Sequence, residues 1–212
     1  MSLDLSEDYL LFDNLTSVTL KFRDGSPDEL INGKALRRAV TFREAMASNG
    51  KVTTSDVHWH IPVDGLNKTP TLGDKIVHGS TEWTVLVREE QTLSTRLRFT
   101  CRDIAITAGL DTVIKIQSST TQKEQATNAI KLVYSDLHTN VRAKIQFVSG
   151  TRDRQSGRDE MVRKWAVSFE QTFAFSPNYR IVGPDGVFYK PVELRDPDDI
   201  GKPFVVICEA YP

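Results

Sequence analysis

One stretch near the end of the chain decides how the rest is interpreted, and it reads Tyr179-Arg180-Ile181-Val182-Gly183-Pro184-Asp185-Gly186-Val187-Phe188-Tyr189-Lys190-Pro191-Val192. An apolar pair leads into a Gly-Pro-Asp-Gly turn, and an aromatic and β-branched segment follows. Pro184 presets its own φ, whereas Gly183 and Gly186 can adopt the positive φ values that tight turns require. The stretch therefore predicts a β-hairpin.

The chain contains this hairpin pattern twice. Residues 74–87 align with residues 179–192 without a gap, at a shift of 105 positions. In this alignment Ile76 corresponds to Ile181, and Trp83 corresponds to Phe188. A period of about one small domain predicts a tandem duplication.

Further segments align in the same order on both sides of the hairpin. They are 17–21 with 112–116, 36–42 with 140–147, 57–61 with 164–168, and 98–103 with 205–210. The shift grows to 107 after the hairpin, and the two extra residues fall in the loop 195–201, where insertions are tolerated best. We therefore predict an all-β chain of two tandem small antiparallel barrels or sandwiches with long loops, with domains at 1–106 and 107–212.

The composition excludes several classes of protein. A net charge of −1 over 212 residues is far from the basic excess of a protein that binds nucleic acid by charge alone. No apolar run approaches the roughly 20 residues that a membrane-spanning helix needs. We expect neither a membrane protein nor an electrostatic nucleic-acid binder.

The two cysteines indicate the redox compartment. Cys101 and Cys208 lie in apolar segments at matched positions of the two copies, which predicts one core thiol per domain rather than a bridge between them. The first eight residues lack the basic region of a signal peptide. We expect a reduced protein that is made in the cytoplasm.

The histidines were considered as metal ligands. A strand places His58 and His60 on one side, opposite Trp59, and we expect both histidines to face solvent and Trp59 to lie in the core. No Cys, Asp or Glu completes a ligand spacing with them or with His78. The sequence also lacks a nucleophile elbow, a phosphate loop and any Cys/His or Ser/His/Asp set. We predict no metal, no cofactor and no enzyme activity.

Long polar segments and the N-terminal residues are candidates for contacts with other molecules. The segment 43–56, with room for one helical turn, and the longer, charged segment 148–162 occur at the same place in the two copies. Loops of this length in small β domains are often functional. The apolar run Tyr9-Leu10-Leu11-Phe12 within residues 1–14 suggests an arm that docks on a neighbour.

Motifs in a fixed order run through residues 112–210. They are Val141-Arg142-Ala143-Lys144-Ile145-Gln146, Arg180-Ile181-Val182, the Asp185-Gly186 turn, Phe188-Tyr189, Leu194-Arg195-Asp196-Pro197 and the apolar segment 205–208. This series resembles the head-tail joining (head completion, or stopper) family of tailed phages. The first copy resembles a diverged member through 73–77 and 83–85.

The resemblance implies a β-barrel that assembles as a ring beneath the portal, closes the DNA-filled head and presents a platform for the tail. The implied partners are further copies of the chain, a portal or adaptor protein, tail terminator or other tail proteins, and packaged double-stranded DNA in the channel. The implied location is the neck of a virion assembled in the bacterial host cytoplasm.

In that family a long loop projects into the channel. By position this loop is 148–162 here, with 43–56 as its counterpart. The charged residues of this region are candidates for contacts with DNA or with a neighbouring subunit: Arg152, Asp153, Arg154, Arg158, Asp159, Arg163 and Lys164. Their mixed signs suit ion pairs between subunits at least as well as DNA phosphates.

Two other functions stay open at this point. A tail-side structural protein, such as a terminator or a tube or adaptor component, could share a similar barrel. An oligonucleotide-binding barrel would need exposed aromatic residues on a basic face. Trp59, Trp83, Phe169 and Phe188 instead alternate with polar residues as core residues do, which favours a structural protein.

Overall fold

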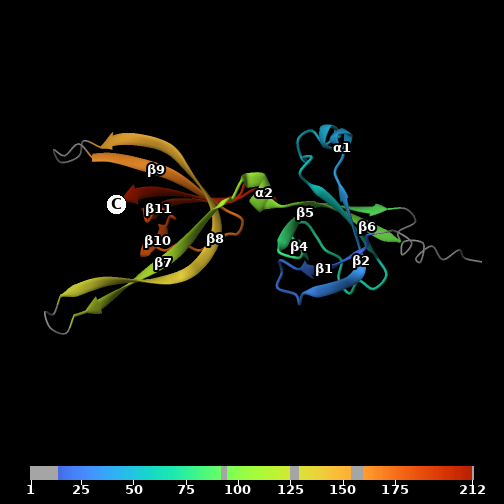
Figure 1. Ribbon diagram of the computed structural model, residues 1–212, viewed down its shortest axis with the longest axis horizontal. Coiled ribbons are helices and arrows are strands. Elements are labelled where there is room, and N and C mark those ends of the chain that lie inside the picture. Colours follow the sequence, from blue (N-terminus) through green and yellow to red (C-terminus); the bar gives the residue numbers. More distant parts are fainter. Residues whose placement is uncertain (1–13, 92–94, 125–128, 154–159, 212) are drawn as a thin grey trace, which may run out of the picture. The chain divides into compact units, whose positions relative to one another are not determined.

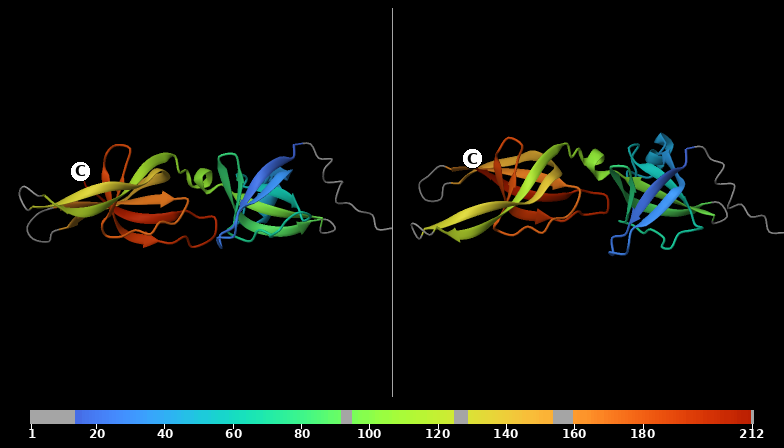
Figure 2. Two further views of the ribbon diagram at one scale, coloured as in Figure 1. Left: turned by 90° about the horizontal axis from the view of Figure 1, so that it is seen from below. Right: turned by 60° about the horizontal axis from the view of Figure 1, so that its bottom comes forward.

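The computed structural model describes residues 14–91, 95–124, 129–153 and 160–211. This part of the chain is nearly all β, and its strands form two closed antiparallel barrels in tandem (Figures 1 and 2). The predicted all-β fold of two small barrels is confirmed. The chain divides into two compact units, one of residues 1–107 with 199–201 and the other of residues 108–198 with 202–212.

The first barrel has the strand order β1-β2-β3-β6-β5-β4. Its elements are β1 (Thr16–Lys21), β2 (Glu29–Ala39), α1 (Phe42–Ala47), β3 (Val57–Pro62), β4 (Lys75–His78), β5 (Thr81–Gln91) and β6 (Arg96–Arg102), followed by α2 (Ile104–Ala108). Trp59 and Phe99 are cross-strand partners and both are fully buried. The core position predicted for Trp59 is therefore confirmed.

The second barrel repeats this order as β7-β8-β9-β12-β11-β10. Its strands are β7 (Thr112–Lys123), β8 (Ile130–Asp153), β9 (Glu160–Phe169), β10 (Tyr179–Val182), β11 (Phe188–Arg195) and β12 (Phe204–Tyr211). The ring of Phe169 packs against Phe173 and Phe204 at the centre of its core. Each pair of segments matched in the sequence lies in corresponding strands of the two barrels.

The alignment within the hairpins needs a correction. Ile76 pairs with Trp83, whereas Ile181 pairs with Tyr189. The counterpart of Trp83 is therefore Tyr189, which is buried, and not Phe188, which is half-buried. The gapless alignment was wrong because the turn of the second hairpin is one residue longer, and a count of residues does not reveal which residues pair.

A smaller correction concerns the strands that hold the cysteines. Cys101 pairs with Val57, and Cys208 pairs with Trp165. Trp165 is therefore the counterpart of Val57, one position away from the alignment made on sequence. Both thiols are free and fully buried, and burial raises the pKa of each, that of Cys208 to about 12. The prediction of one core thiol per domain is confirmed.

Strand β8 turns a corner of the second barrel. Its first part pairs with β7 and its second part with β9, and Ala143 pairs with both Thr112 and Phe169. Ala143 is fully buried, and a small side chain suits a place where three strands meet closely. Just before it, Asn140 adopts a φ of +56° beside a register shift. Asparagine tolerates this left-handed conformation, and such a bulge bends the strand.

Both ends of strand β8 extend beyond the barrel. It has 24 residues, well above the usual strand length, and it forms one two-stranded ribbon with β7 and another with β9. Figures 1 and 2 show both ribbons leaving the same end of the second barrel. The prediction that 148–162 is a loop is wrong at both ends, since β8 continues to Asp153 and β9 begins at Glu160. In the first barrel, α1 occupies part of the segment 43–56.

Candidate assembly site on the second barrel

The structure does not gather the charged residues predicted for the loop into one cluster. Arg163 and Lys164 are neighbours on β9 and therefore point to opposite faces. Arg152 and Asp153 lie on β8, with backbones opposite residues 161 and 160, but their side chains are not described. The remaining charged residues of the prediction, and the arm, lie outside the described residues: Arg154, Arg158, Asp159, Tyr9, Leu10, Leu11 and Phe12.

Strand β9 leads from the barrel core to an open mouth. Its residues Arg163, Trp165, Val167 and Phe169 alternate onto one face. Val167 and Phe169 are fully buried in the core, Trp165 is half-buried, and Arg163 is exposed. The row thus runs outward along the inner face of the barrel, and it places Arg163 at the rim where the β8–β9 ribbon begins.

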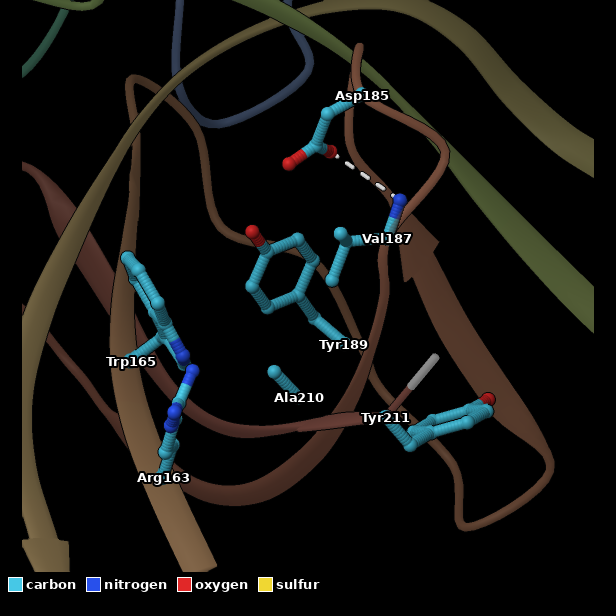
Figure 3. A pocket seen from close by; sticks show the side chains of 7 residues that line it. All are labelled: Arg163, Trp165, Asp185, Val187, Tyr189, Ala210 and Tyr211. Carbon is cyan, nitrogen blue, oxygen red and sulfur yellow. Dashed lines mark hydrogen bonds between the residues drawn. The ribbon is translucent and has the colours of Figure 1, made fainter.

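A pocket of about 420 Å³ occupies this mouth. Figure 3 shows the charged groups of Arg163 and Asp185 on opposite sides of a group of aromatic and small apolar side chains. The lining residues are Arg163, Trp165, Asp185, Val187, Tyr189, Ala210 and Tyr211. They come from β9, β12 and the β10–β11 hairpin, so the pocket depends on barrel closure.

Among the described residues, one polar group of the pocket has a hydrogen-bond partner and another has none. Asp185 accepts a hydrogen bond from the backbone N–H of Val187 at 3.2 Å. The indole Nε1 of Trp165 is buried and has no hydrogen-bond acceptor among the described residues. Burial, and then the nearby Asp185, raise the pKa of Tyr189. Since buried indole N–H groups usually have an acceptor, the mouth is suited to an apolar group accompanied by a carbonyl oxygen.

Phe147 extends the aromatic surface beyond the pocket. Its ring meets that of Trp165 edge-on, with 5.5 Å between the ring centroids. The Phe147 side chain is 55% exposed, although it lies on the inner side of β8 opposite Trp165. The mouth therefore continues into an exposed aromatic surface.

A stack of aromatic rings around one arginine anchors the β7–β8 ribbon. The guanidinium carbon of Arg180 lies 3.4 Å from the ring centroid of Tyr134 and 4.0 Å from that of Phe188. Phe188 stacks in turn on Tyr211, with 5.7 Å between centroids. Arg180 Nε also donates to Gln117 Oε1 at 2.8 Å. Cation–π contacts of this kind are stabilising. Together with the ring stack and the hydrogen bond, they join residues of five strands at the base of the ribbon.

The far end of this ribbon exposes apolar side chains. Ile130 is 77% exposed and Leu132 is 55% exposed. They alternate with Lys131 and lie opposite Lys123 and Thr121 of β7, so both project from the same face of the ribbon. Two large aliphatic side chains on one face of a projecting ribbon form an apolar patch without cover from the described residues of this chain.

In the first barrel, the prediction that His58 and His60 face solvent is wrong, since each is only 7% exposed. His58 Nδ1 is hydrogen-bonded to Thr100 Oγ1 at 3.0 Å, and its Nε2 lies 3.5 Å from Glu44 Oε1 of α1. Glu44 is fixed by a capping box with Thr41. The polar side of β3 is buried because α1 approaches it, which alternation alone cannot indicate.

These histidines lead to a prediction about pH. Burial, helped by Arg96 and Arg38, lowers the pKa of His60 from 6.5 to about 4, so the unfolded chain binds more protons between these pH values. The free energy of unfolding of the first barrel should be highest above about pH 6.5. It should fall by about 1–3 kcal/mol as the pH approaches 4. Urea unfolding in a Trp165→Phe background, followed by the fluorescence of the first barrel, measures this change.

The control for the pH experiment is a histidine in the other barrel. His60→Gln should reduce the dependence between pH 6.5 and 5 and leave the part due to His58, whose pKa is also lowered by burial, whereas His138→Gln, at an exposed position of β8, should leave it unchanged. If His60→Gln keeps the full pH dependence, other groups cause it.

No family model, curated protein or solved structure matches the chain. The assignment of function therefore rests on the motifs in the sequence and on the surfaces of the two barrels.

Within the described ranges, no three His, Cys, Asp or Glu side chains are grouped so that they could hold a metal ion. His78 lies against the ring of Trp59, on the inner side of β3, and so does not converge with His58 and His60. None of the helices among the described residues has the length and apolar character to cross a bilayer.

Several residues of the site were missed in the sequence. The mouth residues Trp165 and Tyr211 and the ribbon residues Ile130 and Leu132 carry no motif of their own. The alternation from Ile130 to Tyr134 is a strand signal that could have indicated the ribbon. The aromatic residues that were expected in the core are confirmed there, except Phe188, which is half-buried in the Arg180 stack.

Proposed function

We propose that this chain is a structural virion protein of the phage neck. In this role it forms a ring between portal and tail, closes the DNA-filled head and joins the tail to it. The observation that carries the proposal is the extension of β8 into two ribbons beside an open aromatic mouth. Projecting ribbons with exposed apolar residues are surfaces for assembly rather than for the stability of an isolated domain.

Other features support the same role. The motif order of residues 112–210 resembles that of head completion proteins, and the strand order of the first barrel equals that of the second, as expected after duplication and divergence. The partners in this proposal are further copies of the chain, the portal or an adaptor, tail proteins and the DNA in the channel. The charges of the β8–β9 ribbon would face a neighbouring subunit or that DNA. The role requires neither catalysis nor a cofactor.

The test is an assembly experiment. The purified chain, alone and mixed with its portal protein, is examined by native mass spectrometry and negative-stain electron microscopy. Closed rings that dock on the tail-facing end of the portal are the expected result, and they give the copy number. A persistent monomer that ignores the portal and caps tail tubes would contradict the neck assignment and favour a tail-side protein.

A shortened ribbon separates the ring contact from the retention of DNA. Residues 151–162 are removed and a two-residue Asn-Gly turn joins Gly150 to Arg163, which are partners across the ribbon. The barrel should fold with unchanged tryptophan emission and the variant should still form rings in native mass spectrometry, while heads completed with it should lose their DNA. The comparison variant lacks the equal number of residues 121–132 of the β7–β8 ribbon, between the partners Thr120 and Val133, and shows whether rings also survive the loss of that ribbon. Retention of DNA by heads completed with the shortened β8–β9 ribbon would argue against a role for this ribbon in holding DNA.

A further inference from the structure

The described part of the β7–β8 ribbon ends in an apolar patch, Ile130 and Leu132, which its own barrel does not cover; this patch is called the tip below. Ile130 and Leu132 are mostly exposed and lie on one face of the ribbon. The Arg180 stack holds the base of the ribbon against the barrel, and backbone pairing continues to Lys123 and Ile130. The ribbon therefore extends away from the barrel, and its tip is presented to another molecule.

The same barrel carries a site with matching chemistry. The mouth is aromatic at Trp165, Tyr189 and Tyr211, and it has one indole donor without an acceptor among the described residues. Arg163 and Asp185 stand on opposite sides of the opening (Figure 3). An incoming strand edge would supply aliphatic side chains and backbone carbonyl oxygens, which are the groups that this mouth can bind.

We propose that the tip of the β7–β8 ribbon of one copy inserts Ile130 and Leu132 into the mouth of the second barrel of another copy. Charges on the two surfaces are complementary, because Lys123 is the cross-strand partner of Ile130, projects from the same face of the ribbon and can meet Asp185 at the mouth. A backbone carbonyl of the tip accepts the hydrogen bond of Trp165 Nε1.

This contact would supply the subunit interface of the ring proposed above. The contact itself does not depend on the proposed function, whereas its role in a phage neck does. Each copy has one tip and one mouth, and these are different surfaces. A contact between different surfaces can be repeated from copy to copy until it closes. The two ribbons thereby have different roles, with the β7–β8 ribbon binding the neighbouring subunit.

Cysteine cross-linking between differently tagged copies tests the contact directly. One copy carries Leu132→Cys and the other Val187→Cys in the mouth, while the native Cys101 and Cys208 are fully buried and do not compete. Mild oxidation should give a disulfide-linked heterodimer in about 10-fold higher yield than the control pair Leu194→Cys with Val187→Cys. Leu194 is a suitable control because it is 47% exposed, close to the 55% of Leu132. Equal yields from both pairs would overturn the proposal.

A second measurement avoids any change in the mouth. The double variant Ile130→Asp/Leu132→Asp alters only exposed side chains and should fold normally, as judged by circular dichroism and Trp165 emission. Its self-association, measured by sedimentation velocity, should weaken at least about 10-fold, whereas Leu194→Asp should associate like the wild type. Undiminished association of the double variant would contradict the proposal.

The outcomes also distinguish the contact from the function. Specific cross-links without binding to the portal would support the contact between copies and contradict the neck assignment. Rings that dock on the portal without the Leu132–Val187 cross-link would leave the neck assignment and overturn the contact.

Discussion

Phe169→Ala is expected to lower the free energy of unfolding of the second barrel by about 3–5 kcal/mol. Phe169 is fully buried, and its ring contacts Phe173, Phe175 and Phe204 with centroid separations of 5.2, 6.0 and 6.2 Å. Removing this ring opens a cavity at the centre of the aromatic core, and the closed sheet can collapse onto it only in part. The loss is measured by urea unfolding, with hydrogen exchange of β9 and β12 peptides reporting on this barrel.

The matched control removes the same ring from the mouth of the same barrel. Phe147 is 55% exposed, so Phe147→Ala should cost less than about 1 kcal/mol. It touches Trp165, and a small shift in Trp165 emission should accompany it. Similar losses of stability for the two variants would contradict the description of Phe169 as the centre of the core.

The second large effect is expected at a buried ion pair of the first barrel. Arg102 Nε and Nη2 donate to Asp56 Oδ1 and Oδ2, each at 2.8 Å, and Asp56 also accepts from the backbone N–H of Thr53 at 2.8 Å. The side chain of Asp56 is fully buried, and that of Arg102 is 13% exposed. Asp56→Ala removes the charged partner of Arg102, which keeps only the carbonyl oxygen of Lys51 as an acceptor among the described residues. The substitution also leaves the Thr53 N–H without its acceptor, so it should cost about 3–5 kcal/mol. Urea unfolding in the Trp165→Phe background measures the loss.

An exposed pair provides the control for this prediction. Arg195 Nε and Glu193 Oε1 are 2.9 Å apart, but the two side chains are 58% and 54% exposed. Glu193→Ala should therefore change the free energy of unfolding of its own, second barrel by less than about 0.5 kcal/mol, as followed by hydrogen exchange of β11 and β12 peptides. If Asp56→Ala costs no more than Glu193→Ala, the buried pair does not stabilise the first barrel as described.

The core and the repeat could be predicted because their signals are local. Gly183, Pro184 and Gly186 specify a turn, and alternation about Trp59 and Phe169 specifies strands with one buried face. Cys101 and Cys208 were correctly assigned as core thiols, because both sit within apolar strands at matched positions. Such patterns depend only on neighbours along the chain, so they can be recognised without knowledge of the tertiary structure.

The register of the hairpins and the burial of the histidines could not be predicted in this way. Tyr189, rather than Phe188, replaces Trp83 because the second turn has one more residue. His58 is buried because Glu44 of α1 approaches the outer side of β3. In both cases the outcome depends on a contact between segments, and alternation within one segment is the same whether or not that contact exists.

By itself, the sequence determined that this protein is a tandem of two all-β domains with aromatic cores, because turn residues and side-chain alternation are properties of each segment alone. The positions of the surfaces proposed for assembly follow from the tertiary structure alone. The mouth unites Trp165, Tyr189 and Tyr211 from three strands, and β8 extends into two ribbons by pairing with a different strand on each side of Ala143. Barrel closure and strand pairing bring together residues distant in the chain, and no local pattern records which of them will meet.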